Sequence, residues 1–364
     1  MKTNILKNFF AFFTFFISIS LFAQNSGVKV VDLKPEFNHN KFPEIQIINN
    51  EKVQNKINTS LQLEYLEHLP NVFKFNPYEE LKTDDENHEY IMEFYGWKVN
   101  ESPKNILSIA IEAEYTGPNP EGFMVYENYD LRNGNQITVN NIFTQEGIKI
   151  LGKVVNDKIN LKIKNFIEEL NQIKPANNEE KETIKVETEV NKFCMKLNES
   201  YPLEFYKCTF ENDKITFLER GTSNRGKGSK YKLDVIKFSF TFKELEKFMT
   251  DYGKNLCFNQ ANDIKSSSID GKMFKGKIDN KYSITALVKE YPSNKGVYIY
   301  YWYDKYNQPI EWIGKFENNQ FKMKEENENN QEILIEANYI ENKIIGNWKN
   351  KTTNKTLKLE LIEY

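Results

Sequence analysis

Apolar side chains near the start of the chain follow first the period of a strand and then the period of a helix. Residues 44–48 alternate between apolar and polar side chains, which predicts a strand. The next apolar residues recur every four positions, as one face of a helix does: Val53, Ile57, Leu61 and Tyr65. Asn49 or Asn50 can cap this helix and Pro70 ends it, so we expect the helix to run through Leu66.

Strand-type patterns follow this helix. Two runs of aromatic and β-branched residues, 89–99 and 105–115, predict a hairpin, and residues 123–131 predict a further strand. Asn133-Gly134 is a strong hairpin dipeptide, so we expect residues 136–139 to return and pair with that strand.

A second stretch with helical periodicity begins at Thr144 and is broken by Pro175. The charged tract 178–190 predicts either a weaker helix or a mobile arm. Thr241 and Glu244 form a capping-box pattern that predicts a helix up to Gly253. The intervening apolar runs predict three more strands, near residues 204–210, 214–219 and 232–240. We therefore expect residues 43–259 to form an α+β domain with a mostly antiparallel sheet.

Helical periodicity disappears in the last hundred residues. Residues 260–270 are polar and serine-rich and predict a linker. From residue 271, short half-alternating runs are separated by Asn-rich turns, and three segments repeat one pattern: 274–278, 312–316 and 345–348. This regularity predicts an all-β meander or small barrel of six to eight strands over residues 271–364. The predicted fold class is therefore α+β with a separate all-β module.

The first residues have the parts of a secretory signal peptide. Lys2 and Lys7 precede an uncharged apolar stretch, residues 9–22, and the small residue Ala23 precedes polar sequence. The stretch is shorter than the ~20 residues that a membrane span needs. We expect cleavage near residue 23, a linker over 24–42 and an exported chain, periplasmic or secreted, with no transmembrane span. An uncleaved N-terminal anchor is the alternative.

Composition restricts the function classes. The chain has 49 basic and 52 acidic residues, a formal charge of −3, so it lacks the basic excess of a nucleic-acid-binding protein. Outside the cytoplasm disulfides are permitted. Cys194 and Cys208 flank one helix-to-strand connection and are our preferred pair, and three buried thiols are the alternative.

The sequence contains no recognisable catalytic or metal-binding motif. The three histidines show no metal-ligand spacing, and no Gly-x-Ser-x-Gly nucleophile elbow occurs. We therefore expect no cofactor, no metal site and no catalytic residues, and we favour a binding protein over an enzyme.

Two segments are candidate binding surfaces. One is a basic loop, which would attract an anionic partner and contains Arg220, Arg225, Lys227 and Lys230. The other is an aromatic strand on which Tyr298, Tyr300 and Trp302 share one face. Aromatic rings with polar tips suit a sugar or peptide, although a well-packed strand has the same pattern.

Three stretches in the first half occur in a distinctive order: residues 114–117, 128–134 and 137–143. They resemble a strand end, an Asp-Leu-x-x-Gly turn and the entry to a helix in one bacterial extracytoplasmic domain. Residues from about 42 to 255 thus resemble the domain family shared by the anti-sigma-V factor and peptidoglycan deacetylase C. One departure is that residues 117–122 read Gly-Pro-Asn-Pro-Glu-Gly, where the family usually has Gly-Gly-Ala-His.

The resemblance implies a partner. In the anti-sigma factor the domain binds lysozyme, which implies a lysozyme- or peptidoglycan-type partner here, recognised by the loops 117–122 and 220–230. The last hundred residues resemble small β modules of secreted bacterial proteins. We expect a non-enzymatic envelope protein that binds a protein or glycan. A cell-wall or glycan hydrolase and a small-ligand carrier using the barrel are the alternatives.

Overall fold

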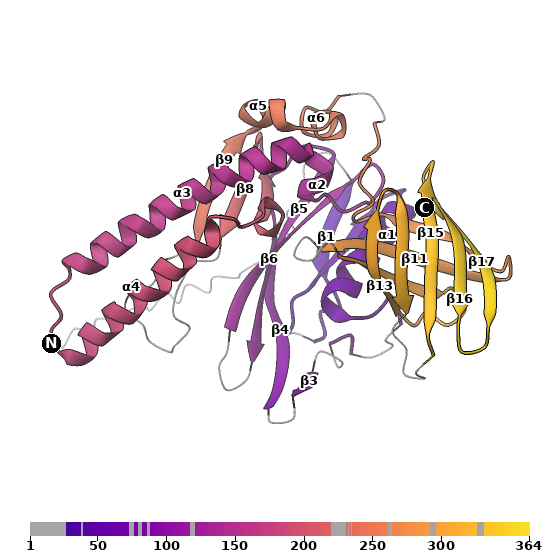
Figure 1. Cartoon of the computed structure of the whole chain (residues 1–364), viewed down its shortest axis with the longest axis horizontal. Coiled ribbons are helices and arrows are strands. Elements are labelled where there is room, and N and C mark those ends of the chain that lie inside the picture. Colours follow the sequence, from indigo (N-terminus) through magenta and orange to yellow (C-terminus); the bar gives the residue numbers. More distant parts are fainter. Residues whose placement is uncertain are drawn as a thin grey trace, which may run out of the picture.

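The chain has two structured units, an α+β unit and a closed antiparallel barrel, which confirms the predicted fold class (Figure 1). The computed structural model describes residues 27–37, 39–72, 76–78, 82–85, 88–116, 121–219, 231, 233, 235–260, 264–291, 296–325 and 331–364. The predicted signal peptide lies outside the described residues.

The α+β unit begins with a two-stranded sheet. β1 (Val28–Asp32) pairs antiparallel with β2 (Pro43–Ile47), and Val28, Val30 and Phe42 are buried. We expected a linker over residues 24–42, and β1 corrects that expectation for residues 28–32. Val28 and Val30 alternate with polar or less buried neighbours, and this short two-residue pattern is enough to anchor an edge strand when a core lies beside it.

Helix α1 (Glu51–Leu66) has the predicted limits. The Asn50 side chain accepts a hydrogen bond from the Val53 N–H at 3.3 Å, and the helix ends at Glu67, whose φ is 57°. Asn58 holds the helix against β2, because its amide accepts from the Ile45 N–H and donates to the Ile45 carbonyl, both at 2.8 Å. The apolar face of α1 packs on the sheet that follows.

Four antiparallel strands form that sheet, in the order β3-β4-β5-β6. The predicted hairpin is confirmed, with a β-bulge between Phe94 and Gly96. The strands are β3 (Lys82–Asp85), β4 (His88–Val99), β5 (Ile106–Thr116) and β6 (Glu121–Asp130). β3 and β6 are therefore the two edge strands of the sheet.

The chain that follows β6 forms only the start of the return strand that the Asn133-Gly134 turn predicted. Gln136 bridges Tyr129, and the flanking hydrogen bonds run from the Asp130 N–H to the Asn135 carbonyl and from the Ile137 N–H to the Asn128 carbonyl. The Asn141 side chain accepts a hydrogen bond from the Thr138 N–H at 2.7 Å, so helix α2 (Val139–Ile142) starts where the strand was expected. This helix cap turns the chain away from β6.

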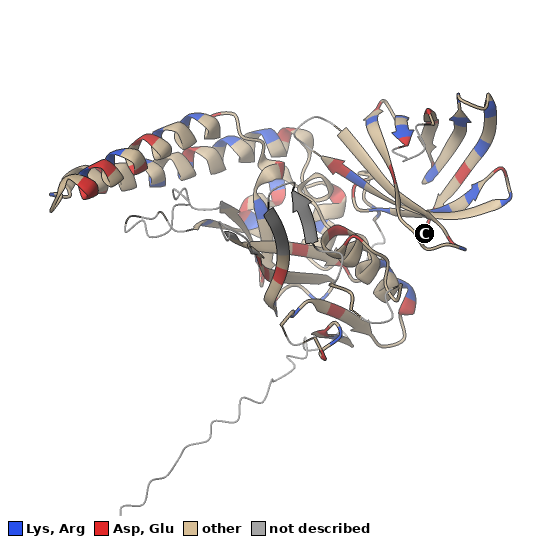
Figure 2. Ribbon diagram, turned by 90° about the horizontal axis from the view of Figure 1, so that it is seen from below, with Lys and Arg blue, Asp and Glu red and all other residues tan. Residues whose placement is uncertain are grey.

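Two long helices form an antiparallel hairpin that projects from the body of the molecule (Figure 1). α3 (Gln145–Gln172) is capped by Thr144, and α4 (Asn178–Asn198) is capped by Asn177. The tract from residue 178 is therefore a helix, not a mobile arm. Figure 2 shows both signs of charge interspersed along the hairpin, as expected for solvated helix faces.

A three-stranded sheet and short helices complete the α+β unit. The predicted capping box of Thr241 and Glu244 is confirmed, but the expected helix up to Gly253 is interrupted, because Met249 forms a bridge to Phe143. The elements are η1 (Leu203–Phe205), β7 (Lys207–Glu211), β8 (Lys214–Glu219), β9 (Ile236–Thr241), α5 (Phe242–Leu245), η2 (Glu246–Phe248) and α6 (Asp251–Cys257).

The C-terminal unit is a closed eight-stranded barrel in which each strand pairs with the next and β17 pairs with β10. Its interior is filled by large side chains, including Trp312, Phe274 and Tyr301. The strands are β10 (Met273–Ile278), β11 (Tyr282–Tyr291), β12 (Gly296–Tyr303), β13 (Ile310–Glu317), β14 (Gln320–Glu325), β15 (Ile333–Ile340), β16 (Lys343–Asn350) and β17 (Lys355–Glu363).

The three repeated segments of the barrel share one structural feature, a glycine at a close backbone approach. A Cβ at Gly276, Gly314 or Gly346 would collide with the backbone carbonyl oxygen of a neighbouring strand. These glycines let the strands lie close enough to curve into a barrel of this size.

The outer face of the barrel packs against the α+β unit. Leu287 of β11 and Trp302 of β12 share an apolar cluster with Leu63 of α1 and with Leu69. The two units therefore sit side by side with α1 between the sheet and the barrel (Figure 1).

Candidate functional site

A groove of about 640 Å³ runs along the outer edge of β6 and is the candidate functional site. Helix α1 forms one wall, the β7–β8 hairpin with Val235 forms the other, and the edge strand lies between them. Its lining residues are Glu64, Tyr65, Tyr95, Glu112, Ala113, Glu114, Tyr115, Gly122, Phe123, Met124, Val125, Tyr126, Lys207, Leu218 and Val235.

The backbone of β6 is open toward this groove. In a strand, alternate residues direct their N–H and C=O groups to opposite neighbours. The Asn128 carbonyl accepts from the Ile137 N–H at 2.7 Å, so even-numbered residues of β6 face outward, away from β5. The same period turns the N–H and C=O groups of Met124 and Tyr126 outward, and no backbone group in the described part of the chain pairs with them.

Exposed apolar side chains surround the open edge. The rings of Tyr115 and Phe123 stack with centroids 5.1 Å apart. Met124 is 40% exposed and Val235 is 47% exposed, on the opposite side of β6 from those rings. An apolar patch of this kind, lying next to open backbone groups, is typical of an interaction surface.

The charged residues of the groove are mostly acidic. Glu64, Glu112 and Glu114 contribute three carboxylates, and Lys207 contributes the single ammonium of the lining. Complementary charge steers encounters and selects partners. The groove therefore favours a partner segment with positive charge.

A buried polar network behind the groove joins the two units. The Tyr65 hydroxyl and the Gln136 amide both donate to Glu127 on β6. Lys289 of the barrel donates to the Gln136 side chain at 2.7 Å and lies 3.1 Å from a Glu64 oxygen. Burial raises the pKa of the Glu127 carboxyl above its ordinary range. The network fixes the position of the groove wall relative to the barrel.

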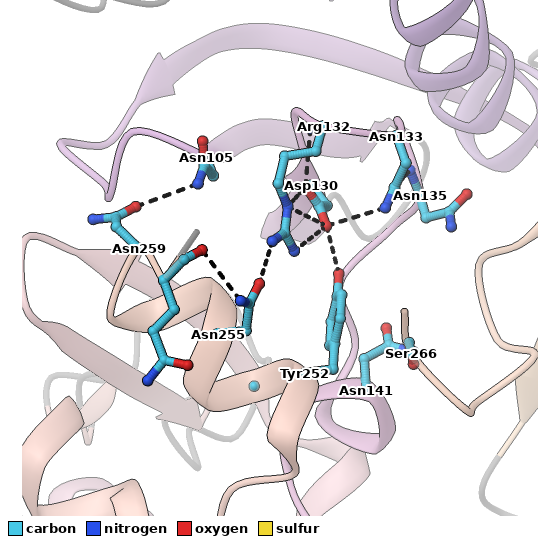
Figure 3. A network of polar contacts seen from close by, with 12 residues as sticks. Asn105, Asp130, Arg132, Asn133, Asn135, Asn141, Tyr252, Asn255, Asn259 and Ser266 are labelled. Atoms are coloured by element: carbon cyan, nitrogen blue, oxygen red, sulfur yellow. Dashed lines mark hydrogen bonds and ion pairs between the residues drawn. The ribbon is translucent and has the colours of Figure 1, made fainter. Parts of the chain in front are cut away.

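The Asp-Leu-x-x-Gly turn, which carries much of the family resemblance, has a structural role in this chain. Asp130 is fully buried and accepts from the Arg132 guanidinium, from the Tyr252 hydroxyl at 2.9 Å and from Asn133 at 3.1 Å (Figure 3). Arg132 also donates to Asn255 on α6. These contacts tie the end of β6 to α6 and so define where the open edge ends.

Neither predicted binding surface contributes a described residue to the lining of the groove. Arg220, Arg225, Lys227 and Lys230 lie outside the described residues, as do residues 117–120. Trp302 is only 7% exposed, because it packs with Tyr300 in the interface between the units. An aromatic outer face was expected to meet a sugar or peptide, but at Trp302 it already meets the α+β unit.

Tyr298 and Tyr300, the other two residues of that face, are half-buried. The Tyr298 ring lies with its centroid 4.5 Å from that of Tyr291 on the neighbouring strand. Burial raises the pKa of the Tyr300 hydroxyl well above its usual value. Both side chains thus contribute mainly to packing on the barrel surface.

The predicted disulfide is absent from the structure, in which Cys194, Cys208 and Cys257 are thiols. Burial raises the pKa of both the Cys208 and Cys257 thiols to about 12. Cys208 sits on β7 near Glu127, whose charge raises the pKa further. Cys194 and Cys208 are both partly buried and pack against the same apolar core, whereas Cys257 is buried. Both residues of the expected pair therefore contribute to the packing of one core.

Two features of the described residues bear on other functions. No group of three or more His, Cys, Asp or Glu side chains in that part of the chain is arranged to hold a metal ion. Among its helices, none combines the length and the apolar character needed to cross a membrane.

Comparisons with known proteins place the chain only distantly. No family model matches it, and no curated protein matches it. Among solved structures, it is similar to the crystal structure of a DUF3298-family member from Bacteroides fragilis, with 10% sequence identity and a TM-score of 0.36. That likeness covers 65% of this chain and 96% of the other.

Sequence reasoning missed the groove, although one signal for it was present. The segment 121–127 contains neither proline nor lysine, the residues that commonly protect an edge strand. The expected return strand at 136–139 would have covered this edge. Only the tertiary structure shows that the chain turns away instead.

Proposed function

We propose that this chain is an exported, non-enzymatic envelope protein that binds a protein partner in the groove along β6. One observation carries the proposal: the outward backbone groups of Met124 and Tyr126 lie within an apolar groove, and no backbone group among the described residues pairs with them. Open strand edges are costly to expose because they invite association, so an edge kept open beside apolar side chains is best explained by a partner that covers it.

The resemblance to the domain of the anti-sigma-V factor supports the class of partner. It implies a lysozyme-type protein or peptidoglycan, and the acidic lining of the groove suits a basic protein such as lysozyme. The barrel would then be a supporting module packed behind α1. Its filled interior gives no support to the alternative of a small-ligand carrier.

The experiment is a biosensor titration of residues 24–364 with lysozyme at low salt and at about 0.15 M salt, where the Debye length is about 8 Å. The groove variant combines Met124→Ser and Val235→Ser. The matched control combines Ile345→Ser and Ile362→Ser on the barrel, because these side chains are 41% and 50% exposed, against 40% and 47% in the groove.

We expect the groove variant to bind roughly tenfold more weakly, which corresponds to about 1.4 kcal/mol, and the barrel control to bind like the unmodified chain. Equal affinity in both variants would overturn the groove as the binding site. Hydrolysis of peptidoglycan that disappears with one carboxylate substitution would instead support the hydrolase alternative.

A further inference from the structure

We infer that the partner is captured as an added β-strand: an extended segment with apolar side chains and net positive charge pairs with the outer edge of β6. The inference rests on the proposed function and specifies its mode. Strand addition supplies affinity through main-chain hydrogen bonds and specificity through alternate side chains.

The edge provides a hydrogen-bonding ladder of defined spacing. Met124 and Tyr126 each direct one N–H and one C=O outward, and such pairs repeat every ~7 Å along a strand. Beyond them the edge is closed, because Asp130 and Asn128 pair with Asn135 and Ile137. An added strand can therefore pair with β6 only before Asn128. Its end at that side is fixed by the turn after β6, whose position depends on the contacts of Asp130.

The opposite edge of the same sheet, strand β3, has features that protect an edge strand against pairing with another strand. β3 consists of four residues, Lys-Thr-Asp-Asp, so it is short and mostly charged. The exposed part of β6 reads Gly-Phe-Met-Val-Tyr over residues 122–126, with no charge. Short length and charge are common devices against strand pairing, and β6 lacks both.

The walls of the groove receive side chains on both sides of an added strand. One side presents Tyr65, Phe123 and Val125, which line the groove below α1. The other side presents Met124 together with Leu218 and Val235. Because strand side chains alternate between faces, an incoming segment can bury apolar side chains on each wall.

Charge selects the occupant. Glu64 is already paired with Lys289 of the barrel, so the carboxylates that face a partner are those of Glu112 and Glu114, and they outnumber the one ammonium of Lys207. An acidic segment would place like charges together, which is costly, whereas lysine or arginine side chains at the ends of the segment would meet carboxylates. A second copy of this chain would bring its own glutamates to the edge and is disfavoured for the same reason.

The probe is a labelled, end-blocked synthetic peptide of about seven residues, with valine in the central positions and lysine at both ends, long enough to span the open edge. Its affinity for residues 24–364 is measured by fluorescence anisotropy. Two matched peptides serve as controls: one carries N-methyl groups on every second amide, which removes donors along one edge, and the other has glutamate in place of lysine.

The protein variants distinguish the contribution of a backbone hydrogen bond from that of a side-chain contact. Met124→Pro removes an outward N–H that β5 does not use, and proline is tolerated on edge strands. Met124→Ala removes a similar side chain but keeps the N–H. We expect Met124→Pro to bind the peptide about tenfold more weakly than Met124→Ala does. We expect the unmodified chain to bind the N-methylated and glutamate peptides at least about tenfold more weakly than the plain peptide.

The outcomes distinguish the inference from the proposed function. Equal affinities of the proline and alanine variants, or of the methylated and plain peptides, would overturn strand addition. If lysozyme binding still responds to the serine pair at Met124 and Val235, the proposed function survives that result. The methylated peptide keeps the test valid should the proline variant unfold. Light scattering that shows a dimer converted to monomer by Met124→Pro would overturn a foreign segment as the occupant.

Discussion

The barrel and the β3–β6 sheet solve the same problem of strand edges in opposite ways. In the barrel every strand has two neighbours, since β10 pairs with both β11 and β17. The sheet has two ends: β3 is short and charged, whereas β6 is long and apolar at its edge. The comparison teaches that closure makes the barrel a self-contained unit, and that the recognition surface lies where a sheet stays open.

The aromatic residues of the two regions differ in the same way. Trp302 on the outside of the barrel is covered by α1, so its apolar surface is used within the chain. Tyr115 beside β6 is 41% exposed, and Met124 is 40% exposed, so both side chains meet solvent more than Trp302 does. Aromatic content alone does not separate packing from binding. What separates them is whether another part of the fold lies opposite.

The largest expected effect comes from breaking the contact between the two regions. Trp302→Ala should lower the free energy of unfolding by about 3–4 kcal/mol, because it removes the largest side chain of the interface cluster. Calorimetry should then show separate transitions for the barrel and the α+β unit. Trp348→Ala, inside the barrel and away from α1, should destabilise the barrel without separating the transitions. A single cooperative transition in the Trp302→Ala variant would contradict this view of the interface.

A second substitution compares one glycine from each region. Gly346→Ala in the barrel should cost about 2–3 kcal/mol, because the new Cβ would collide with the backbone of Glu336 and Ala337. Gly96→Ala in the sheet should change stability by no more than about 0.5–1 kcal/mol, and toward greater stability, since nothing lies within 4 Å of its Cβ. Urea unfolding followed by circular dichroism measures both. Similar shifts for the two variants would show that the barrel does not need close approach at its glycines.

The smallest effect concerns an acid on the barrel where the two regions meet. Burial, and next the charge of Asp270, raise the pKa of Glu290 to about 7, whereas a hydrogen bond from Ser268 lowers it. The folded state thus holds a proton that the unfolded chain releases at lower pH. The stabilising contribution is complete below pH 4.5, the ordinary pKa of the group, and is lost as the pH rises to about 7.

Glu290→Gln should therefore flatten the fall in stability over this pH range and stabilise the protein above it by about 1–2 kcal/mol, a figure reduced for partial solvent screening. Thermal unfolding at a series of pH values measures the effect. Glu360→Gln, an exposed barrel substitution, should leave the slope unchanged. An unchanged slope in the Glu290→Gln variant would mean that Glu290 is ionised in the folded protein at neutral pH.

Local sequence signals predicted many of the elements. Asn50 and Thr241 cap helices where expected, and the Asn-rich turns separate barrel strands, because caps and turns depend on residues close together in sequence. The expected strand at 136–139 does not extend past its start for an equally local reason. Thr138 and Asn141 form a capping box there, so the chain begins a helix and does not continue along β6. β1 was missed because its burial depends on β2 and α1, which cover it.

The candidate site was not predictable from the residues that lined it. Met124 and Val235 are more than a hundred positions apart, and neither carries a chemical motif. The aromatic face at Tyr298, Tyr300 and Trp302 carried the stronger signal, yet Trp302 is buried by α1.

The sequence by itself determined the fold class, most helices and strands of the α+β half and an all-β module of six to eight strands, since periodicity, caps and turns are local properties. That this module closes into a barrel of eight strands was decided by the tertiary structure. The tertiary structure decided which surfaces are covered. Whether an apolar strand face or edge is packed or open depends on segments distant in sequence, and no local pattern encodes that contact. In this protein α1 covers Trp302, whereas no described segment pairs with the outer edge of β6 at Met124 and Tyr126.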